Sequence, residues 1–341
     1  VSNIAELACL EVPEGTSFLL VEEDKTGEAS PFSGEKMSLV TTVYKSSSID
    51  EAIRITNENH ASSGHPGGSV SSGRIVQSLV FNRMDYDIGN PMDRTADILS
   101  YAAGHKALGL YAMSALRNEV VRLVAPDQLP DDVKQQLRLE DILGFRKNPI
   151  TSTPLFREFG AKPLDGHPTP ETPFVWLSTG PSGVGVATSV GLAMTLKDMH
   201  RERAPAVHVI EGEGGMTPGR VAESLAAAAT SGLDNLYFHV DWNQASIDSN
   251  AVTRDGGVPG EYVQWDPCEF LLMHGFNVVC VADGFDFAQI REAQKRAEAL
   301  DNGRPTGIVY RTVKGWKYGI EGCKSHGAGH KFYSEAYLES L

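Results

Sequence analysis

The sequence is poor in cysteine and holds no long apolar run. Its four cysteines, Cys9, Cys268, Cys280 and Cys323, show neither a CxxC pair nor a zinc-like spacing, so we expect reduced thiols in a cytoplasm. No apolar run reaches the roughly 20 residues that cross a bilayer, and the N-terminus lacks the charged and apolar parts of a signal peptide. These absences predict a soluble cytoplasmic protein with no membrane partner.

Positive charge is also in short supply. Among the 341 residues, 30 lysines and arginines stand against 44 aspartates and glutamates, which gives a formal net charge of −14. A nucleic acid needs a basic surface to neutralise its phosphates, so this composition argues against such a partner. A small phosphorylated ligand needs only a few local donors and is not excluded by the net charge.

The chain is long enough for one large α/β domain with an extension. Residues 1–45 differ in pattern from the rest, because the apolar segment Phe18–Val21 is followed by the polar stretch Glu22–Glu35. We expect residues 1–45 to form an N-terminal extension, to which we assign no chemistry. Residues 46–341 are expected to form a single domain.

Short β-rich runs alternate with helical patterns along this domain. The expected strands are 98–101, 206–210, 236–240, 277–281 and 307–310. The expected helices are 69–81, 107–116, 184–199, 221–229 and 287–300, and residues 145–173 are expected to form a long loop. Such alternation predicts a mostly parallel, doubly wound α/β sheet with helices on both faces. Ligands of such sheets lie beyond the carboxyl ends of the strands.

Two of the predicted strands end in oxygen-bearing side chains. The strand 206–210 runs into Glu211–Gly215, where Gly212 and Gly214 let a ligand approach the backbone closely. The next strand ends at Asn243, which adjacent parallel strands would place beside Glu213. A carboxylate and an amide oxygen suit Mg²⁺ or Ca²⁺ bridging to a diphosphate. Taken by itself, the glycine run is also compatible with an ordinary turn that carries a solvated glutamate.

Several motifs together resemble the transketolase family of thiamine diphosphate enzymes. The Gly212-Glu213-Gly214 run followed by Asn243 is similar to the family's cofactor motif, which begins GDG and ends in Asn. The other matching segments, in the family's order, are 61–68 (ASSGHPGG), 99–105 (LSYAAGH), 166–168 (GHP) with 178–185 (STGPSGVG), and 241–248 (DWNQASID). The matches cover roughly residues 48 to 330.

The resemblance implies thiamine diphosphate with Mg²⁺ (or Ca²⁺) as cofactors. It implies metal ligation by Glu213, Asn243 and the backbone carbonyl near Ala245. The residues that it implies for binding the organic cofactor, besides Glu213 and Asn243, are His105, Gly180, Pro181, Ser182, Gly212, Gly214, Glu223, Ile247 and His326.

Three histidines are implied as catalytic by the same resemblance. His65 and His167, each in a Gly-His-Pro turn, are expected to face the thiazolium ring and a sugar substrate. His326 is expected to reach the diphosphate and the substrate, with His330 as its rival. The remaining histidines are interpreted as surface or core residues; they are His60, His200, His208, His239 and His274.

The sequence departs from the family pattern in places. Glu213 stands where the family usually has Asp, and Pro218 stands where the family has a glutamate. The loop from Phe145 to Asp165 is also longer than its family equivalent. The departures at Glu213 and Pro218 leave a catalytically silent scaffold subunit open as an alternative. An E1-type component of a 2-oxoacid dehydrogenase and a deoxyxylulose-type synthase component share the cofactor fold and are further alternatives.

The resemblance also implies a second domain, which we expect on another chain. In the family, a second domain supplies the glutamate that activates the pyrimidine ring and the arginines that bind the substrate phosphate. We therefore expect the N-terminal subunit of a split transketolase, active with a pyrimidine-binding C-terminal partner subunit in a dimer of heterodimers. The expected reaction transfers a two-carbon ketol unit between sugar phosphates. A fragment of a longer chain is the alternative to a split enzyme.

Overall fold

The computed structural model describes residues 65–146, 160–247, 249–250, 262–263 and 265–327, and the backbone of two short strands nearer the N-terminus. Those strands are β1 (Leu19–Glu22) and β2 (Val40–Val43), which pair in parallel with Leu19 opposite Val40. The segment expected to be an extension therefore contains regular structure of its own.

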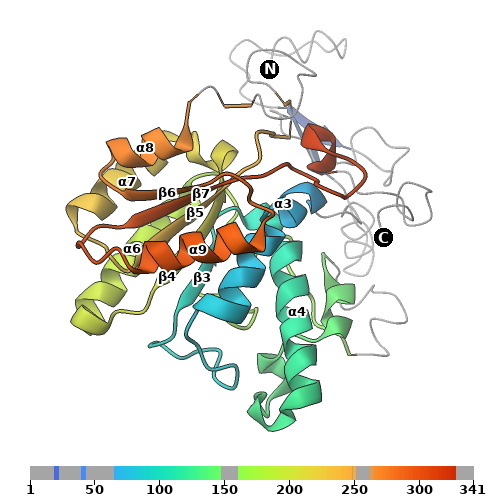
Figure 1. The fold of residues 1–341 in the computed structure, drawn as a ribbon. Coiled ribbons are helices and arrows are strands. Elements are labelled where there is room, and N and C mark those ends of the chain that lie inside the picture. The colour runs from blue at the N-terminus through green and yellow to red at the C-terminus, as the bar shows by residue number, and fades with distance from the viewer. Residues whose placement is uncertain are drawn as a thin grey trace.

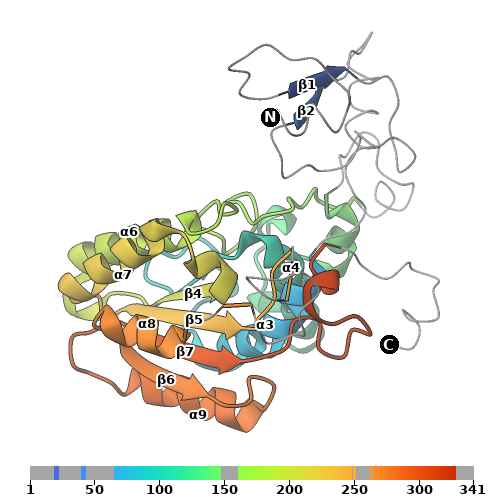
Figure 2. The ribbon, with the colours of Figure 1, turned by 90° about the horizontal axis from the view of Figure 1, so that it is seen from above.

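The main sheet has five parallel strands in the order β3-β4-β5-β7-β6 (Figure 1). The strands are β3 (Ile98–Tyr101), β4 (Val207–Gly212), β5 (Leu236–Trp242), β6 (Asn277–Val281) and β7 (Thr306–Arg311). Strands β5, β6 and β7 point the same way in Figure 2. The predicted parallel α/β sheet is confirmed, and every predicted strand is present within two residues of its expected bounds.

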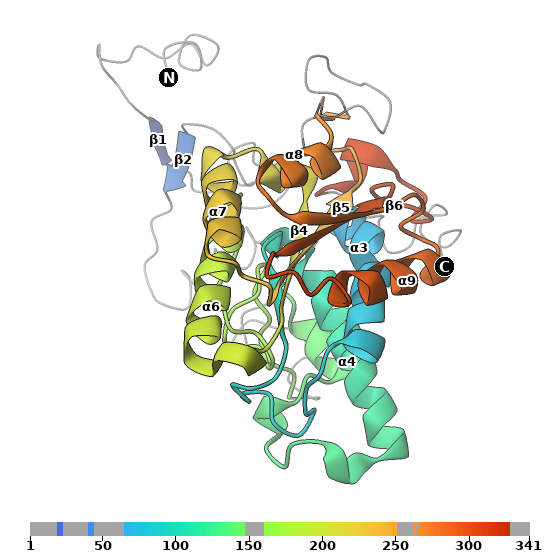
Figure 3. The same cartoon turned by 60° about the vertical axis from the view of Figure 1, so that its left-hand side comes forward.

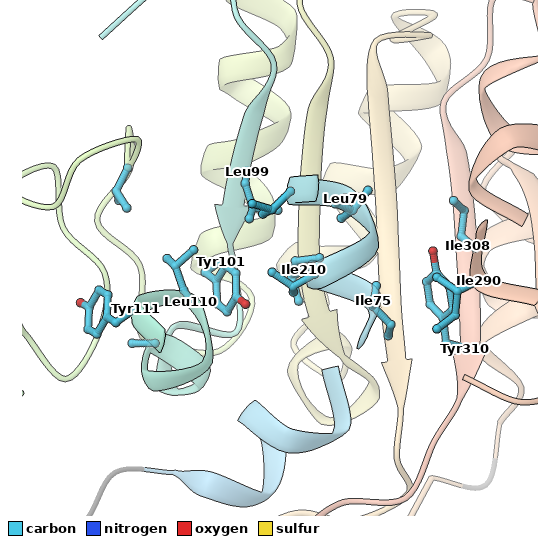
Figure 4. Close-up of a cluster of buried hydrophobic side chains, with 14 of the residues drawn as sticks. Ile75, Leu79, Leu99, Tyr101, Leu110, Tyr111, Ile210, Ile290, Ile308 and Tyr310 are labelled. Carbon is cyan, nitrogen blue, oxygen red and sulfur yellow. The ribbon is translucent and has the colours of Figure 1, made fainter. Parts of the chain in front are cut away.

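Helices cover both faces of this sheet. One face carries α3 (Pro66–Ser78), α4 (Ala107–Val124) and α9 (Phe287–Glu298), and the other carries α6 (Val184–His200), α7 (Gly219–Thr230) and α8 (Pro267–Met273). Figure 3 shows the sheet between the two helical layers. Successive strand residues point to opposite faces, so Val209 packs in one core and Ile210 in the other. The cluster of Figure 4 is the core on the α3 side.

Three helices differ from the sequence prediction. Helix α3 starts earlier, at Pro66, because proline at the first helical position has the helical φ angle built in; it ends at Ser78 and continues as a π-helical turn, Leu79–Arg83. Helix α4 continues past Leu116 to Val124. The guanidinium of Arg117 lies 4.1 Å from the centre of the Phe174 ring, a tertiary contact that the local pattern does not contain. Helix α8 was not predicted, because it is only a short segment beside the sheet.

The cysteine prediction is wrong for two residues. Cys268 on α8 and Cys280 on β6 form a disulfide, although they are 12 positions apart in a sequence that shows no paired spacing. The sheet brings them together by placing α8 beside the edge strand β6. Cys323 is a free thiol.

Short 3₁₀ turns connect many of the elements. They are Gly104–Lys106, Pro126–Gln128, Val133–Gln135, Leu139–Gly144, Arg201–Arg203, Glu213–Met216 and Gly322–Ser325. In the part of the chain that the structure describes, no helix is both long and apolar enough to span a membrane.

Candidate active site

The candidate site lies at the carboxyl edge of the sheet, which we define as the C-terminal ends of β3, β4, β5 and β7 with the loops that follow them. The start of α3 reaches the same edge, because Gly67 accepts a backbone hydrogen bond from Gly315, beyond β7. The strand ends, where ligands of parallel sheets bind, and the start of α3 therefore lie together at this edge.

A buried aspartate organises the centre of this edge. Asp241, at the end of β5, has a fully buried side chain. Its Oδ2 accepts hydrogen bonds from Lys106 Nζ (2.7 Å), Ser71 Oγ (2.6 Å) and Asn243 Nδ2 (3.0 Å), and its Oδ1 accepts one from Thr312 Oγ1. Burial by itself would raise the pKa of this carboxyl, but the Lys106 ammonium and the hydrogen bonds hold it below its usual value. Asp241 is therefore charged and fixes the orientation of the Asn243 amide.

The predicted metal ligands lie together beside Asp241. Glu213 is 1% exposed, and its two carboxylate oxygens accept hydrogen bonds from the backbone N–H groups of Asn243 and Ala245, both at 3.2 Å. Because Asn243 Nδ2 donates to Asp241, Asn243 Oδ1 is left as an acceptor, 3.3 Å from Ala245 N. Burial, and then the charge of Asp241, raise the pKa of Glu213 to about 7. Gln244 has a φ of 57°, a left-handed conformation that turns the loop sharply at this point.

A lysine that the sequence interpretation did not identify contacts the same loop. Lys314, beyond β7, is 3% exposed, and its Nζ donates a hydrogen bond to the Ala245 carbonyl at 3.1 Å. Its Nζ also lies 2.6 Å from His326 Nδ1. Burial lowers the pKa of Lys314 to about 8, against the pull of the Glu213 charge. Nothing in the local sequence marked this lysine, because its partners are distant along the chain.

Three histidine rings cluster beside this loop. The ring centres of His65, His105 and His326 lie 5.0–5.4 Å apart, and His105 and His326 are nearly parallel. Burial, and then the Arg146 charge, lower the pKa of His65 to about 4; burial, and then the Lys314 charge, lower that of His326 to about 3. Burial also holds the pKa of His105 well below its usual value. All three rings are therefore neutral near pH 7.

His167 lies at the border of the same cluster. A methyl group at Gly104 would lie 3.0 Å from Cδ2 of His167, and one at Gly180 would lie 3.4 Å from it, so both turns pass close to the imidazole. The charge of His167 is also among the causes that lower the pKa of His65. Thr179 Oγ1 is buried beside Gly104 without a hydrogen-bond partner among the described residues. Such an orphaned hydroxyl is typical of a surface that binds a ligand.

Other predicted residues lie around this edge with fewer contacts. Pro181 and Ser182 are exposed just before α6, while Gly212 lies at the end of β4 and Gly214 packs against Tyr262. Ile247 is 38% exposed in the loop after Ala245. Among the described contacts, none brings the exposed Glu223 of α7 to the histidines or to Glu213.

Among the described contacts, the histidines that were interpreted as surface or core residues lie away from the His65 cluster. His208 and His239 are buried in the core, with Nδ1 of the first 3.1 Å from Nε2 of the second. The rings of His200 and His274 each bury an Nε2 that has no partner in the described part of the chain. His60 and His330 lie outside the described residues, so the preference for His326 over His330 stays a prediction.

The oxygen atoms of Glu213, Asn243 and Ala245 fit a hard divalent cation. The Glu213 carboxylate and the Asn243 amide oxygen both accept the Ala245 N–H, and the Ala245 carbonyl lies on the same loop; these are the donor types that Mg²⁺ and Ca²⁺ prefer. The Lys314 ammonium on the Ala245 carbonyl shows that this position already accommodates a positive charge. Across residues 65–327, where described, no cluster of three or more His, Cys, Asp or Glu side chains could hold a metal. The fit therefore depends on the backbone carbonyl and the amide.

The fold and this edge define a thiamine diphosphate-binding domain, and comparison with known proteins agrees. The family model "Transketolase, thiamine diphosphate binding domain" matches residues 135–334. The chain belongs to the transketolase family.

Its relatives are longer proteins. A transketolase of Physarum polycephalum is 30% identical over 288 residues, covering 81% of this chain and 38% of that protein. Transketolase-like protein 2 of Mus musculus is 30% identical over 254 residues, covering 74% of this chain and 34% of that protein. The chain thus spans little more than a third of the length of these relatives.

Solved transketolase structures show the same arrangement. The structure from Campylobacter jejuni aligns with a TM-score of 0.64 at 26% identity, covering 84% of this chain and 40% of that chain. The structure from Leishmania mexicana aligns with a TM-score of 0.61 at 26% identity, covering 78% of this chain and 36% of that chain.

Proposed function

We propose that this chain provides the diphosphate- and metal-binding side of an enzyme that transfers a two-carbon ketol unit between sugar phosphates. One observation carries the proposal: the buried loop of Glu213, Asn243 and Ala245 lies at the same sheet edge as the clustered rings of His65 and His105, which meet edge to face. An anion held by a metal at this loop would lie beside neutral imidazoles, as a diphosphate cofactor requires.

The chain's residues have separate roles in this proposal. Glu213, Asn243 and the Ala245 carbonyl hold Mg²⁺ or Ca²⁺. Thiamine diphosphate, when bound, supplies the carbanion-stabilising chemistry, and the protein positions it. The cofactor-binding residues that we propose beside them are His105, Gly180, Pro181, Ser182, Gly212, Gly214, Glu223, Ile247 and His326.

The histidines act on the substrate as neutral groups. The Lys314 ammonium donates to His326 Nδ1, which places the imidazole proton of His326 on Nε2. A neutral imidazole both donates and accepts hydrogen bonds, so His65, His167 and His326 can orient substrate hydroxyls and pass protons between them. Burial, and for His65 the Arg146 charge, keep the His65 and His326 rings in that form near pH 7.

The rest of the active site is proposed to come from a pyrimidine-binding partner subunit. The chain covers 34–38% of the two relatives described above, and in this proposal the partner supplies residues equivalent to the remainder of those proteins. We propose a split enzyme in the cytoplasm, assembled as a dimer of heterodimers, in which residues 46–341 form the cofactor domain and residues 1–45 an extension. A longer parent chain would supply the same half covalently.

Cofactor titration tests the metal and diphosphate part of the proposal. Thiamine diphosphate with Mg²⁺ should raise the melting temperature of the purified protein, because a ligand that binds only the native state stabilises it. Glu213→Ala should abolish this shift and Glu213→Asp should keep or enlarge it. Glu292→Ala, which removes an exposed glutamate of α9, serves as the control. An unchanged shift in Glu213→Ala would contradict the metal assignment.

Activity with and without a partner tests the other part. The chain alone, with excess cofactor and Mg²⁺, should show no ketol transfer, and adding a pyrimidine-binding subunit should restore it. Full activity of the isolated chain would refute the split enzyme.

A catalytically silent scaffold is the second candidate, and two observations favour it. Both carboxylate oxygens of Glu213 already accept backbone N–H groups, and Pro218 stands where the family has a glutamate. A silent scaffold should bind no thiamine diphosphate at any Mg²⁺ concentration, so the titration separates the two candidates.

A further inference from the structure

Lys314 occupies an unusual position in the candidate site. Its side chain is buried, yet its ammonium lies on the carbonyl oxygen of Ala245, which is one of the three oxygens that fit a divalent cation. The carboxylate of Glu213, a second member of that set, is the strongest attractive charge near it. The ammonium thus bonds one oxygen of the proposed ligand set and is attracted by the charge of a second member.

No carboxylate in the described part of the chain lies at bonding distance from the Lys314 ammonium. Among the described residues, its hydrogen bonds run to the Ala245 carbonyl and to His326 Nδ1, and neither partner carries a negative charge. Asp241, another buried carboxylate of the edge, is paired with Lys106 instead. A buried ammonium is costly unless it is paired, so Lys314 is held here by the same negative field that attracts a metal.

We propose that Lys314 is the resident cation of the metal-ligand set, which a divalent ion must displace before it can bind. This inference rests on the proposed function, because it takes Glu213, Asn243 and Ala245 as the ligands. An ammonium and a divalent ion cannot share the Ala245 carbonyl, since two positive charges at that separation repel strongly in a buried site. Metal entry therefore requires the Lys314 side chain to turn away from the loop.

A diphosphate gives the displaced ammonium a new partner. Its anionic oxygens would pair with both the metal and Lys314, which removes the cost of an unpaired buried charge. Metal and diphosphate should consequently bind in a strongly coupled way: the metal alone weakly, and each one better in the presence of the other. Without the positive charge at position 314, the metal should no longer need the diphosphate.

Binding of Mn²⁺ to the full chain tests this inference without any activity assay. Mn²⁺ prefers the same oxygen ligands as Mg²⁺, and the fraction that stays unbound is read from its electron paramagnetic resonance signal. Each protein is titrated with Mn²⁺ alone and with Mn²⁺ plus inorganic pyrophosphate, and a protein-free series with pyrophosphate is subtracted because pyrophosphate itself chelates Mn²⁺. The variants are Lys314→Met, which removes the charge, and Lys314→Arg, which keeps it.

The two Lys314 variants should differ in their affinity for Mn²⁺ alone. Lys314→Met should bind Mn²⁺ alone about tenfold more tightly than the unmodified protein and should lose most of the coupling to pyrophosphate. Lys314→Arg should keep weak binding of the metal alone. Lys324→Met is the matched control, because it removes an exposed lysine of the same segment and should change neither quantity. Weaker or unchanged binding of Mn²⁺ alone to folded Lys314→Met would overturn the inference.

A second neutral variant and the unmodified protein provide two further tests. If Lys314→Met does not fold, Lys314→Gln provides the neutral variant, and the unmodified protein still must bind Mn²⁺ more tightly with pyrophosphate than without it. Equal affinity under those two conditions would refute the resident cation. If the unmodified protein binds no Mn²⁺ even with pyrophosphate or thiamine diphosphate, the proposed function itself fails. Failure of the inference alone leaves metal binding in place.

Discussion

Two groups of buried polar side chains lie against the same face of the sheet, and they differ in charge. At the carboxyl edge, Asp241 pairs with Lys106 beside the Glu213 loop. Deeper in the sheet, His239 joins His208 (3.1 Å) and the Tyr310 hydroxyl (3.0 Å) in a chain without charge. The first group therefore carries buried charges, whereas the second is a neutral polar core.

The inner chain is complete by itself. Gln294 donates to the Tyr310 hydroxyl, and Ser78 donates to the Gln294 carbonyl, so the chain of bonds continues from the strands into α9 and α3. Burial keeps the pKa values of His208 and His239 far below the usual range, to about 3 for His208. A neutral network with its hydrogen bonds made stabilises the interior without asking for a ligand.

The carboxyl edge, in contrast, holds buried charges and a polar group without a hydrogen-bond partner among the described residues. It holds two buried lysines, a carboxylate with a raised pKa and an orphaned hydroxyl at Thr179. Buried charges of this kind are costly and persist where they serve a ligand.

Asp241→Asn should cost about 3–5 kcal/mol of folding free energy, because it leaves the buried Lys106 ammonium without its counter-charge. Urea unfolding at pH 7 measures the loss. Asp301→Asn, on an exposed aspartate, is the control and should change stability by less than about 0.5 kcal/mol. Adding Lys106→Met to Asp241→Asn should recover part of the loss. A fully stable Asp241→Asn protein would show that the ion pair is not what holds the edge.

His65→Ala and His167→Ala should lower turnover of the active complex about 100-fold or more, while lowering stability little. These residues lie in turns at the carboxyl edge, so their removal opens no hole in either hydrophobic core. Steady-state kinetics and thermal unfolding are measured on the same preparations. A variant with normal turnover and a large loss of stability would place that histidine with the inner chain instead.

His239→Phe should show the reverse pattern, with about 1–3 kcal/mol lost from stability and little change in cofactor binding, because Tyr310 and His208 each lose a partner. The variant should also reduce acid sensitivity. Since burial depresses the folded-state pKa of His239, only the unfolded state gains a proton just below pH 6.5, and stability falls as the pH falls. Unfolding at pH 7.5 and pH 5.5 should reveal a smaller difference in His239→Phe than in the unmodified protein.

Glu211→Gln should raise stability by about 1 kcal/mol at pH 8, because Glu211 Oε2 is buried without a hydrogen-bond partner among the described residues. Burial raises the pKa of Glu211 to about 7. The folded state therefore holds its proton more tightly than the unfolded state, and stability falls as the pH rises from about 4.5 to about 7. The advantage of Glu211→Gln should disappear at pH 5. Exposed Glu171→Gln is the control, and equal gains in both variants would contradict the explanation.

Much of the framework follows from local sequence. The strands 98–101 and 277–281 were predicted with the bounds that the structure has, because a short buried strand has a compact β-rich pattern. The convergence of Glu213 and Asn243 follows from their positions after adjacent parallel strands. The extension of α4 to Val124 was missed, although Pro126, which cannot continue a helix, follows two residues later in the chain.

Local sequence is enough to predict the parallel sheet, the glycine loop at Glu213 and the histidines worth testing, since each depends on neighbours in the chain or on a motif. The distant groups that complete the site come together only in the folded chain. Lys106 meets Asp241 across 135 positions, and Lys314 meets Ala245 across 69. The disulfide between α8 and β6 has the same origin. The physical reason is that burial and pairing of charges depend on spatial proximity, and sheet topology, not chain order, sets that proximity.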